Sequence, residues 1–171
     1  AGDMNIEENL AMALRRGERR TLRWVVPAAE RKRYFEILKH LDLGLENRMT
    51  TKVGLLSGGQ RQALTLLMAT LKAPRLLLLD EHTAALDPKT AAKVLTLSDR
   101  FIAEEKLTAL MVTHNMRDAI QHGNRLLMMH EGKVIVDVSG DEKKSLTVET
   151  LLGMFGKASG QQLASDRMLL S

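Results

Sequence analysis

The chain has 171 residues, of which 44% are hydrophobic and 27% are charged, and its net charge is +4. This balance is typical of a soluble globular protein of one domain, or of one domain with part of a second. The absence of cysteine excludes disulfides and cysteine-ligated zinc, and it is typical of a reducing compartment. The apolar runs are far shorter than the roughly 20 residues that a membrane-spanning helix needs. We therefore expect a cytosolic protein that reaches a membrane only through a partner.

One basic cluster lies near the start of the chain. It contains five arginines, Arg15, Arg16, Arg19, Arg20 and Arg23. Such a cluster can meet lipid headgroups, nucleic acid or an acidic partner. Only Trp24 accompanies it, so there is no aromatic platform on which bases could stack. We expect a solvated helix end and loop, and no nucleic-acid partner.

The first half of the sequence has helical periodicity. Asn5 and Glu8 have the spacing of a capping box, and apolar residues then recur every four positions. Pro27 opens a second helical pattern that ends at Gly44. An extended connector is predicted next, followed by a third helix over residues 57–70.

The second half begins with alternating strands and helices. Residues 75–80 and 108–113 are short apolar runs, which predict two strands buried on both faces of a parallel sheet. Between them, Asp87 and Pro88 start a helix as an N-cap and a proline at the first helical position. This helix is predicted to run to about Glu105. Strand, helix and strand in this order form a βαβ unit and indicate an α/β fold.

The last part of the chain predicts a short helix over residues 116–123 and then an antiparallel hairpin over residues 125–138. Gly132 supplies the positive φ that a tight hairpin turn requires. Thr147 is a candidate cap for a last helix. The glycine- and serine-containing residues 156–160 are expected to form a loose joint after it.

The start of the third predicted helix has the sequence Ser57-Gly58-Gly59-Gln60. This sequence predicts a phosphate-binding geometry. Two glycines beside a serine let the backbone approach an anion closely, and the exposed amides and dipole of a helix start favour phosphate. An ordinary capped helix entry is the alternative.

Two adjacent carboxylates follow the first predicted strand. Asp80 ends this strand at the edge where α/β folds place ligands, and nucleotide-hydrolysing enzymes use such an aspartate to hold magnesium. Glu81 could orient or deprotonate an attacking water, although a structural loop cap is the alternative. His114 ends the other strand and would lie near this edge if the two strands are neighbours. A histidine that only completes local hydrogen bonding is the alternative there.

Together these stretches resemble the ATP-binding-cassette (ABC) family. The resemblance rests on four motifs in order: the LSGGQ signature at residues 56–60, the Walker B strand ending at Asp80 with Glu81, the D-loop at residues 84–87 and the switch histidine His114. It covers nearly the whole chain. It implies a partial P-loop NTPase fold, in which an α-helical signature subdomain precedes part of a RecA-like parallel sheet and a C-terminal antiparallel hairpin.

The resemblance also implies domain boundaries. Residues 1–73 would form the α-helical subdomain that ends with the signature helix. Residues 74–155 would form the C-terminal part of the RecA-like ATPase core, and residues 156–171 would form a tail.

The implied binding face belongs to a dimer of two ATPase subunits. Ser57, Gly58 and Gly59 would contact the γ-phosphate of ATP held by the opposing subunit, and Gln60 would line that site. Asp87 would link the two active sites.

The implied hydrolytic groups are Asp80, which would bind Mg²⁺ mainly through water, and Glu81, which would polarise the attacking water. His114 would contact the γ-phosphate and sense its loss. His82 departs from the proline usual after the catalytic glutamate, which changes local backbone stiffness but removes no catalytic group.

A P-loop is missing from this chain. The motif needs Gly, four residues, then Gly-Lys and Ser or Thr. The Gly-Lys pairs at Gly132 and Gly156 are followed by Val134 and Ala158, and neither pair has a glycine five positions earlier. The Q-loop glutamine and the adenine-stacking aromatic are expected upstream of Ala1. We therefore expect a fragment with no ATPase activity alone, whose uncovered strands lead it to dimerise, swap elements or aggregate.

The implied function is that of an ABC transporter ATPase, which couples hydrolysis of ATP with Mg²⁺ to solute transport. Its partners would be a second ATPase subunit and a transmembrane permease that holds it at the inner face of the cell membrane. The absence of a fused span favours a multi-subunit importer, and residues 55–87 look like ATPase subunits of amino-acid or small-solute uptake systems.

Two alternatives remain. A non-transport ABC protein of DNA repair or translation is one, although only 23 positions separate Ser57 from Asp80 and no cysteine is present, which leaves no inserted coiled coil or zinc module. The other is a truncated binding module that keeps the signature face and complements a partner's ATP.

Overall fold

The computed structural model describes residues 1–17 and 26–159. Its contacts divide the chain into two compact units, Ala1–Met111 and Val112–Ser171. Of the basic cluster, Arg15 follows the first helix and pairs with Glu30 at 3.2 Å. Arg19, Arg20, Arg23 and Trp24 lie outside the described residues. No helix within the two described stretches is long and apolar enough to cross a membrane.

Three helices form most of the first unit: α1 (Ile6–Leu14), α2 (Ala28–Lys39) and α3 (Gly58–Thr70). The predicted capping box of α1 is confirmed, because Glu8 N donates to Asn5 Oδ1 at 2.9 Å and Asn5 N donates to Glu8 Oε2 at 2.7 Å. The predicted starts of α2 and α3 are confirmed as well.

The connector before α3 was predicted to be extended, but it is not. It contains two 3₁₀ turns, η1 (Leu45–Arg48) and η2 (Val53–Leu55). Local bonds close these turns, such as Leu56 N to Val53 O at 3.1 Å. Short i→i+3 bonds satisfy backbone groups in a segment that is too short for a regular helix.

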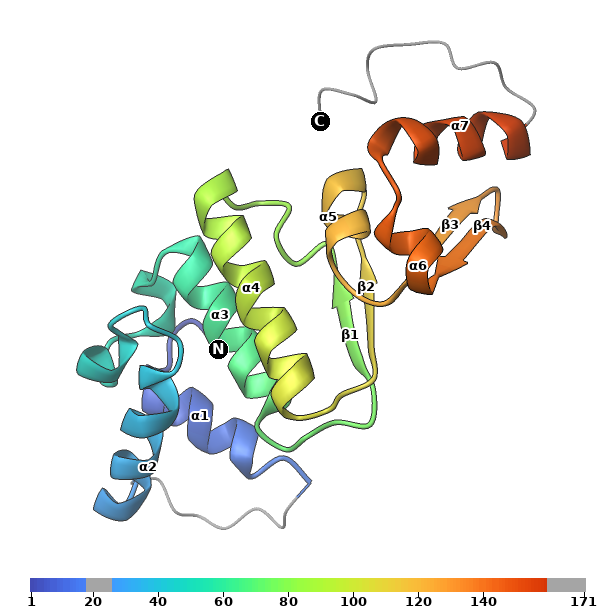
Figure 1. Cartoon of the computed structure of the whole chain (residues 1–171). Coiled ribbons are helices and arrows are strands. Elements are labelled where there is room, and N and C mark those ends of the chain that lie inside the picture. Colours follow the sequence, from blue (N-terminus) through green and yellow to red (C-terminus); the bar gives the residue numbers. More distant parts are fainter. Residues whose placement is uncertain (18–25, 160–171) are drawn as a thin grey trace. The chain divides into compact units, whose positions relative to one another are not determined.

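A strand–helix–strand unit completes the first unit: β1 (Leu77–Asp80), α4 (Pro88–Glu104) and β2 (Ala109–Val112). The strands pair in a two-stranded parallel sheet, and Figure 1 shows α4 between α3 and this sheet. The helix start at Asp87 is confirmed, because Asp87 caps α4 and Pro88 is its first residue.

The prediction that both strands are buried on two faces is wrong for the described residues. Leu77 and Leu79 are buried, whereas Leu78 is 64% exposed and Leu110 of β2 is 50% exposed. The alternate side chains of β1 face outward, because Leu77 and Leu79 pack in the helical core, whereas Ala109, Leu110 and Val112 of β2 are all exposed.

The core of the first unit does not separate helices from sheet. Leu77 and Leu79 of β1 and Leu97 and Phe101 of α4 belong to the same buried cluster as the α1, α2 and α3 leucines. The contacts divide the chain after Met111, and the subdomain boundary between residues 73 and 74 stays a prediction.

The second unit contains α5 (Met116–Gln121), β3 (Arg125–His130), β4 (Lys133–Ser139), α6 (Gly140–Lys144) and α7 (Val148–Ser159). The predicted hairpin is confirmed, since β3 and β4 pair antiparallel. Its turn residues Glu131 and Gly132 have φ values of +47° and +75°. These values are those of a type I′ turn, which matches the twist of the two strands.

The predicted cap of α7 is confirmed, because Thr150 N donates to Thr147 Oγ1 at 3.2 Å. The helix then continues to Ser159, so the loose joint predicted over residues 156–160 is wrong for residues 156–159. Each glycine inside a helix costs only about 1 kcal/mol. The buried Leu151 and Leu152 give α7 enough packing to tolerate Gly153 and Gly156. The short helix α6 was not predicted.

Candidate functional site

The signature residues form the start of α3 (Figure 1). Ser57 is the N-cap: its Oγ accepts from Gln60 N at 3.3 Å, and Ser57 N donates to Gln60 Oε1 at 3.2 Å. The Gln60 side chain also donates from Nε2 to Leu43 O at 3.3 Å. Gln60 thus holds the helix start within this chain. The first amides of α3, at Gly58 and Gly59, have no partner inside the helix and give this start its anion-binding character.

Arg61 joins the signature helix to the turn before it. Its Nη2 donates to Gly54 O at 3.3 Å and to Leu56 O at 3.2 Å. These bonds hold η2 against the first turn of α3. Ser57 and Gly58 are exposed, whereas Gly59 beside them is buried.

The two carboxylates predicted to be hydrolytic lie at the carboxyl end of β1, and both are exposed. Glu81 has φ +41°, in the left-handed region that few residues other than glycine adopt. Its carbonyl accepts from Ala84 N at 3.0 Å, which turns the chain sharply away from Asp80. A strained backbone of this kind is often found at functional sites.

His82 stands where the family pattern has a proline, and its side chain contacts α4. Its Nε2 lies 3.1 Å from Ser98 Oγ on α4, and Ser98 is buried. Ser98 Oγ already donates its proton to Val94 O at 2.9 Å. Ser98 Oγ thus bonds both to Val94 O within its own helix and to the His82 ring. This contact joins the loop after Glu81 to α4, a role that the departure from the family pattern alone did not reveal.

Asp87 ends the same loop as the N-cap of α4. Its Oδ1 accepts from Thr90 N at 3.1 Å. Hydrogen bonds from the Thr90 side chain and then from its backbone amide hold the pKa of the Asp87 carboxyl below its ordinary value. Thr90 was not among the predicted site residues. Its position three residues after the N-cap was the available signal.

His114 is exposed and belongs to the second unit, just before α5. Thr113 Oγ1 accepts from Asn115 N at 3.0 Å, and Asn115 then caps α5. The first unit thus holds the predicted residues from Ser57 to Asp87. The action of His114 with Glu81 stays a prediction.

The described residues contain no group of three or more His, Cys, Asp or Glu side chains that could hold a metal ion. Asp80 contributes a single exposed carboxylate. Magnesium bound with a nucleotide commonly takes one or two carboxylates, with phosphate oxygens and waters completing its shell. Asp80 fits that arrangement but not a metal site made by protein ligands alone.

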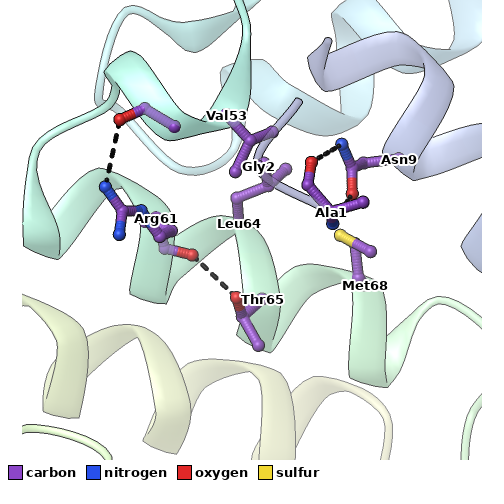
Figure 2. A pocket seen from close by; sticks show the side chains of 9 residues that line it. Ala1, Gly2, Asn9, Val53, Arg61, Leu64, Thr65 and Met68 are labelled. Carbon is purple, nitrogen blue, oxygen red and sulfur yellow. Dashed lines mark hydrogen bonds between the residues drawn. The ribbon is translucent and has the colours of Figure 1, made fainter. Parts of the chain in front are cut away.

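A cavity of about 360 Å³ lies on another side of α3, near the start of α1 (Figure 2). Its lining comprises Ala1, Gly2, Asn9, Val53, Gly54, Arg61, Leu64, Thr65 and Met68. None of the predicted site residues lines it. The amino group of Ala1 donates to Asn9 Oδ1 at 2.6 Å within it.

The comparisons with known proteins match the region that contains the signature loop and the strand ending at Asp80. The family model described as ABC transporter matches residues 2–84. A tyrosine transport ATP-binding protein of Clostridioides difficile (strain R20291) is 46% identical over 156 residues, which is 89% of this chain and 60% of that protein. The chain belongs to the ATP-binding-cassette family.

Other relatives carry different transport names. A thiamine import ATP-binding protein of Salmonella choleraesuis (strain SC-B67) is 32% identical over 153 residues, which is 88% of the chain and 62% of that protein. The chain thus spans about three-fifths of the length of these two curated relatives.

Solved structures share the fold. The ADP conformation of an ATP-binding cassette of an ABC transporter aligns with a TM-score of 0.70 at 23% identity, over 90% of this chain and 63% of that one. A dimeric bacterial ABC transporter cassette aligns with a TM-score of 0.64 at 29% identity, over 81% of this chain and 58% of that one. The fold is therefore part of the ABC ATPase fold.

Proposed function

We propose that this chain is the signature-bearing and hydrolytic part of an ATP-binding subunit of an ABC importer. The observation that carries the proposal is the capped start of α3, with Ser57 and Gly58 exposed, in one unit with the exposed Asp80–Glu81 pair. A helix start presents amides to an anion, and an adjacent pair of carboxylates serves magnesium and water.

The binding half of the mechanism acts across a dimer. Ser57, Gly58 and Gly59 would meet the γ-phosphate of ATP that an opposing subunit holds in its own P-loop. Gln60 would line that site while keeping its cap on α3. Asp87, at the start of α4, would connect the two active sites.

The hydrolytic half depends on groups at the end of β1. Asp80 would hold Mg²⁺, which neutralises charge on the phosphates during hydrolysis. Glu81 would accept a proton from the attacking water, and His114 would contact the γ-phosphate. The transport partner would be a permease at the inner face of the cell membrane, with the second ATPase subunit beside it.

Import of an amino acid is the proposed transport reaction, because the tyrosine transport relative shares 46% identity over 89% of the chain. Uptake of labelled tyrosine in the source cell, with the gene's Glu81 changed to Gln, tests it. Uptake should fall to background. Unchanged tyrosine uptake together with loss of thiamine uptake would reassign the substrate.

Binding across the dimer can be tested with the chain itself and the full-length Clostridioides difficile relative. Calorimetry should show binding of the chain only when Mg-ATP is present, and Gly58→Asp should abolish it through repulsion between the carboxylate and the phosphates. Leu55→Ser is the matched control, because Leu55 is 73% exposed beside the signature. Equal binding without nucleotide would contradict the proposal.

The chain alone should show no ATPase activity, because it lacks the P-loop that supplies most contacts to the phosphates. A coupled phosphate-release assay measures this directly. Turnover that disappears on Glu81→Gln would refute the expectation, whereas turnover that survives the substitution would come from a contaminating enzyme.

A further inference from the structure

The two signature glycines lie against the first turn of α4 and the residue before its N-cap. A Cβ added to Gly59 would come within 2.0 Å of Thr90 Cγ2, and a Cβ added to Gly58 would come within 3.1 Å of Leu86 Cδ2. Contact between two carbons is normally about 3.5–4.0 Å. At Gly59, only a hydrogen fits the space that the Thr90 methyl leaves.

The backbone conformation does not explain Gly59. It is the second residue of α3, and its φ lies outside the positive range that favours glycine. At such a position alanine is the better helix former, by about 1 kcal/mol. The close approach of Thr90 therefore excludes a larger side chain there. Thr90 has a β-branched side chain with few χ1 rotamers, so its methyl group has few other positions to take.

Thr90 makes a second contact, on the other side of the same turn. Its backbone amide donates to Asp87 Oδ1 at 3.1 Å, and Asp87 is the N-cap that starts α4. One residue thus touches the buried glycine of the signature and the carboxylate that is proposed to connect two active sites. A shift of the Asp87 cap must move Thr90 and press its methyl group on Gly59.

We propose that Thr90 is a positioning residue that joins the signature loop to the Asp87 cap, through its Cγ2 methyl on Gly59 and its amide on the Asp87 carboxylate. The contact holds the start of α3 and the start of α4 at one separation. The proposal rests on the proposed function for the roles of Gly59 and Asp87. It adds a route by which the two elements move together within a single subunit.

The test is a mutant cycle in the full 171-residue chain with the variants Gly59→Ala, Thr90→Ser and the double variant. Serine keeps the hydroxyl and the amide of Thr90 but lacks the methyl group. Thr90→Val keeps a methyl group in that position but removes the hydroxyl that lowers the pKa of Asp87, so it serves as the control for the melting temperature alone. The measurements are the melting temperature and the pKa of the Asp87 carboxyl, obtained by NMR titration.

Gly59→Ala should lower the melting temperature by roughly 2–12 °C, as overpacking does, and should raise the pKa of Asp87 toward its ordinary value. Thr90→Ser should restore both properties in the Gly59→Ala background. Thr90→Val in that background should not restore the melting temperature. If Gly59→Ala fails to fold, recovery of folding by Thr90→Ser and not by Thr90→Val supports the proposal equally.

Three results would overturn it: a Gly59→Ala variant with unchanged melting temperature and Asp87 titration, a double variant with Thr90→Ser that recovers neither, or equal rescue by Thr90→Val. No nucleotide is present in these measurements. Failure here is therefore distinguishable from failure of the proposed ATP-dependent binding.

Discussion

Single polar side chains start three helices of the first unit. Asn5, Ser57 and Asp87 each accept a backbone amide three residues later. The spacing of Asn5 and Glu8 and the Asp87-Pro88 pair predicted two of these caps, and a capped helix entry was the alternative interpretation at Ser57. Such caps are local, so they can be predicted without the fold. The contact of Thr90 with Gly59 joins residues that are 31 positions apart, and no local pattern indicates it.

Acid should destabilise the protein partly through Asp87. Its folded-state pKa is lowered, so its contribution is fully present above the unfolded pKa of about 3.9 and is lost as the pH falls through the folded value. Asp87→Asn keeps a cap oxygen but cannot titrate. It should flatten the fall in stability below about pH 4 and change little at pH 7.

Urea unfolding at stepped pH measures that effect. Asp87→Ala is the control, since it removes cap and charge together and should lower stability at pH 7 as well. An Asp87→Asn variant whose stability falls with acid as steeply as that of the parent chain would contradict the assignment.

At the scale of elements, helix starts and the hairpin follow the sequence, whereas connectors and strand burial do not. The β3–β4 turn was predictable because Gly132 must adopt a positive φ. The 3₁₀ turns η1 and η2 were not, because their bonds compete closely with an extended chain. Exposure of Leu78 was not predictable either, because an apolar run does not say how many of its faces are covered.

Substitutions of the two hairpin-turn residues should have opposite effects on the stability of the hairpin. Glu131 has a positive φ that asparagine adopts more readily, so Glu131→Asn should stabilise the hairpin by about 0.5 kcal/mol. Gly132→Ala should destabilise it by about 1 kcal/mol, because its φ of +75° disfavours a Cβ.

Hydrogen exchange of the β3 and β4 amides reports on both turn variants. Glu131→Gln removes the same charge without the backbone preference of asparagine, and it should leave exchange almost unchanged. Equally slowed exchange in Glu131→Gln and Glu131→Asn would show that charge, and not backbone conformation, decides the stability of the turn.

At the scale of the whole molecule, apolar sheet faces remain uncovered in both units. In the first unit Leu76, Leu78 and Leu110 are 51%, 64% and 50% exposed. In the second, Met129 and Val134 are 64% and 52% exposed. Exposed apolar strands favour pairing with another chain.

The isolated chain should therefore self-associate, and Leu78→Ser should weaken this. Light scattering coupled to size-exclusion chromatography should show a lower mean mass for the variant at equal concentration. Leu55→Ser, at a side chain that is 73% exposed outside the sheet, should not change the mass. A parent chain that is monomeric with a cooperative melt would contradict the expectation.

The family follows from the sequence alone, because LSGGQ, Asp80-Glu81 and Asp87 are local patterns with fixed spacing, and the proposed site residues come from the same patterns. Helix starts follow for the same reason, since caps act within one turn. Only the tertiary structure decided that β1 and α4 share a core with the signature helices, so that contacts divide after Met111. It also decided that Gly59 faces Thr90, because close packing joins side chains that are distant in the sequence.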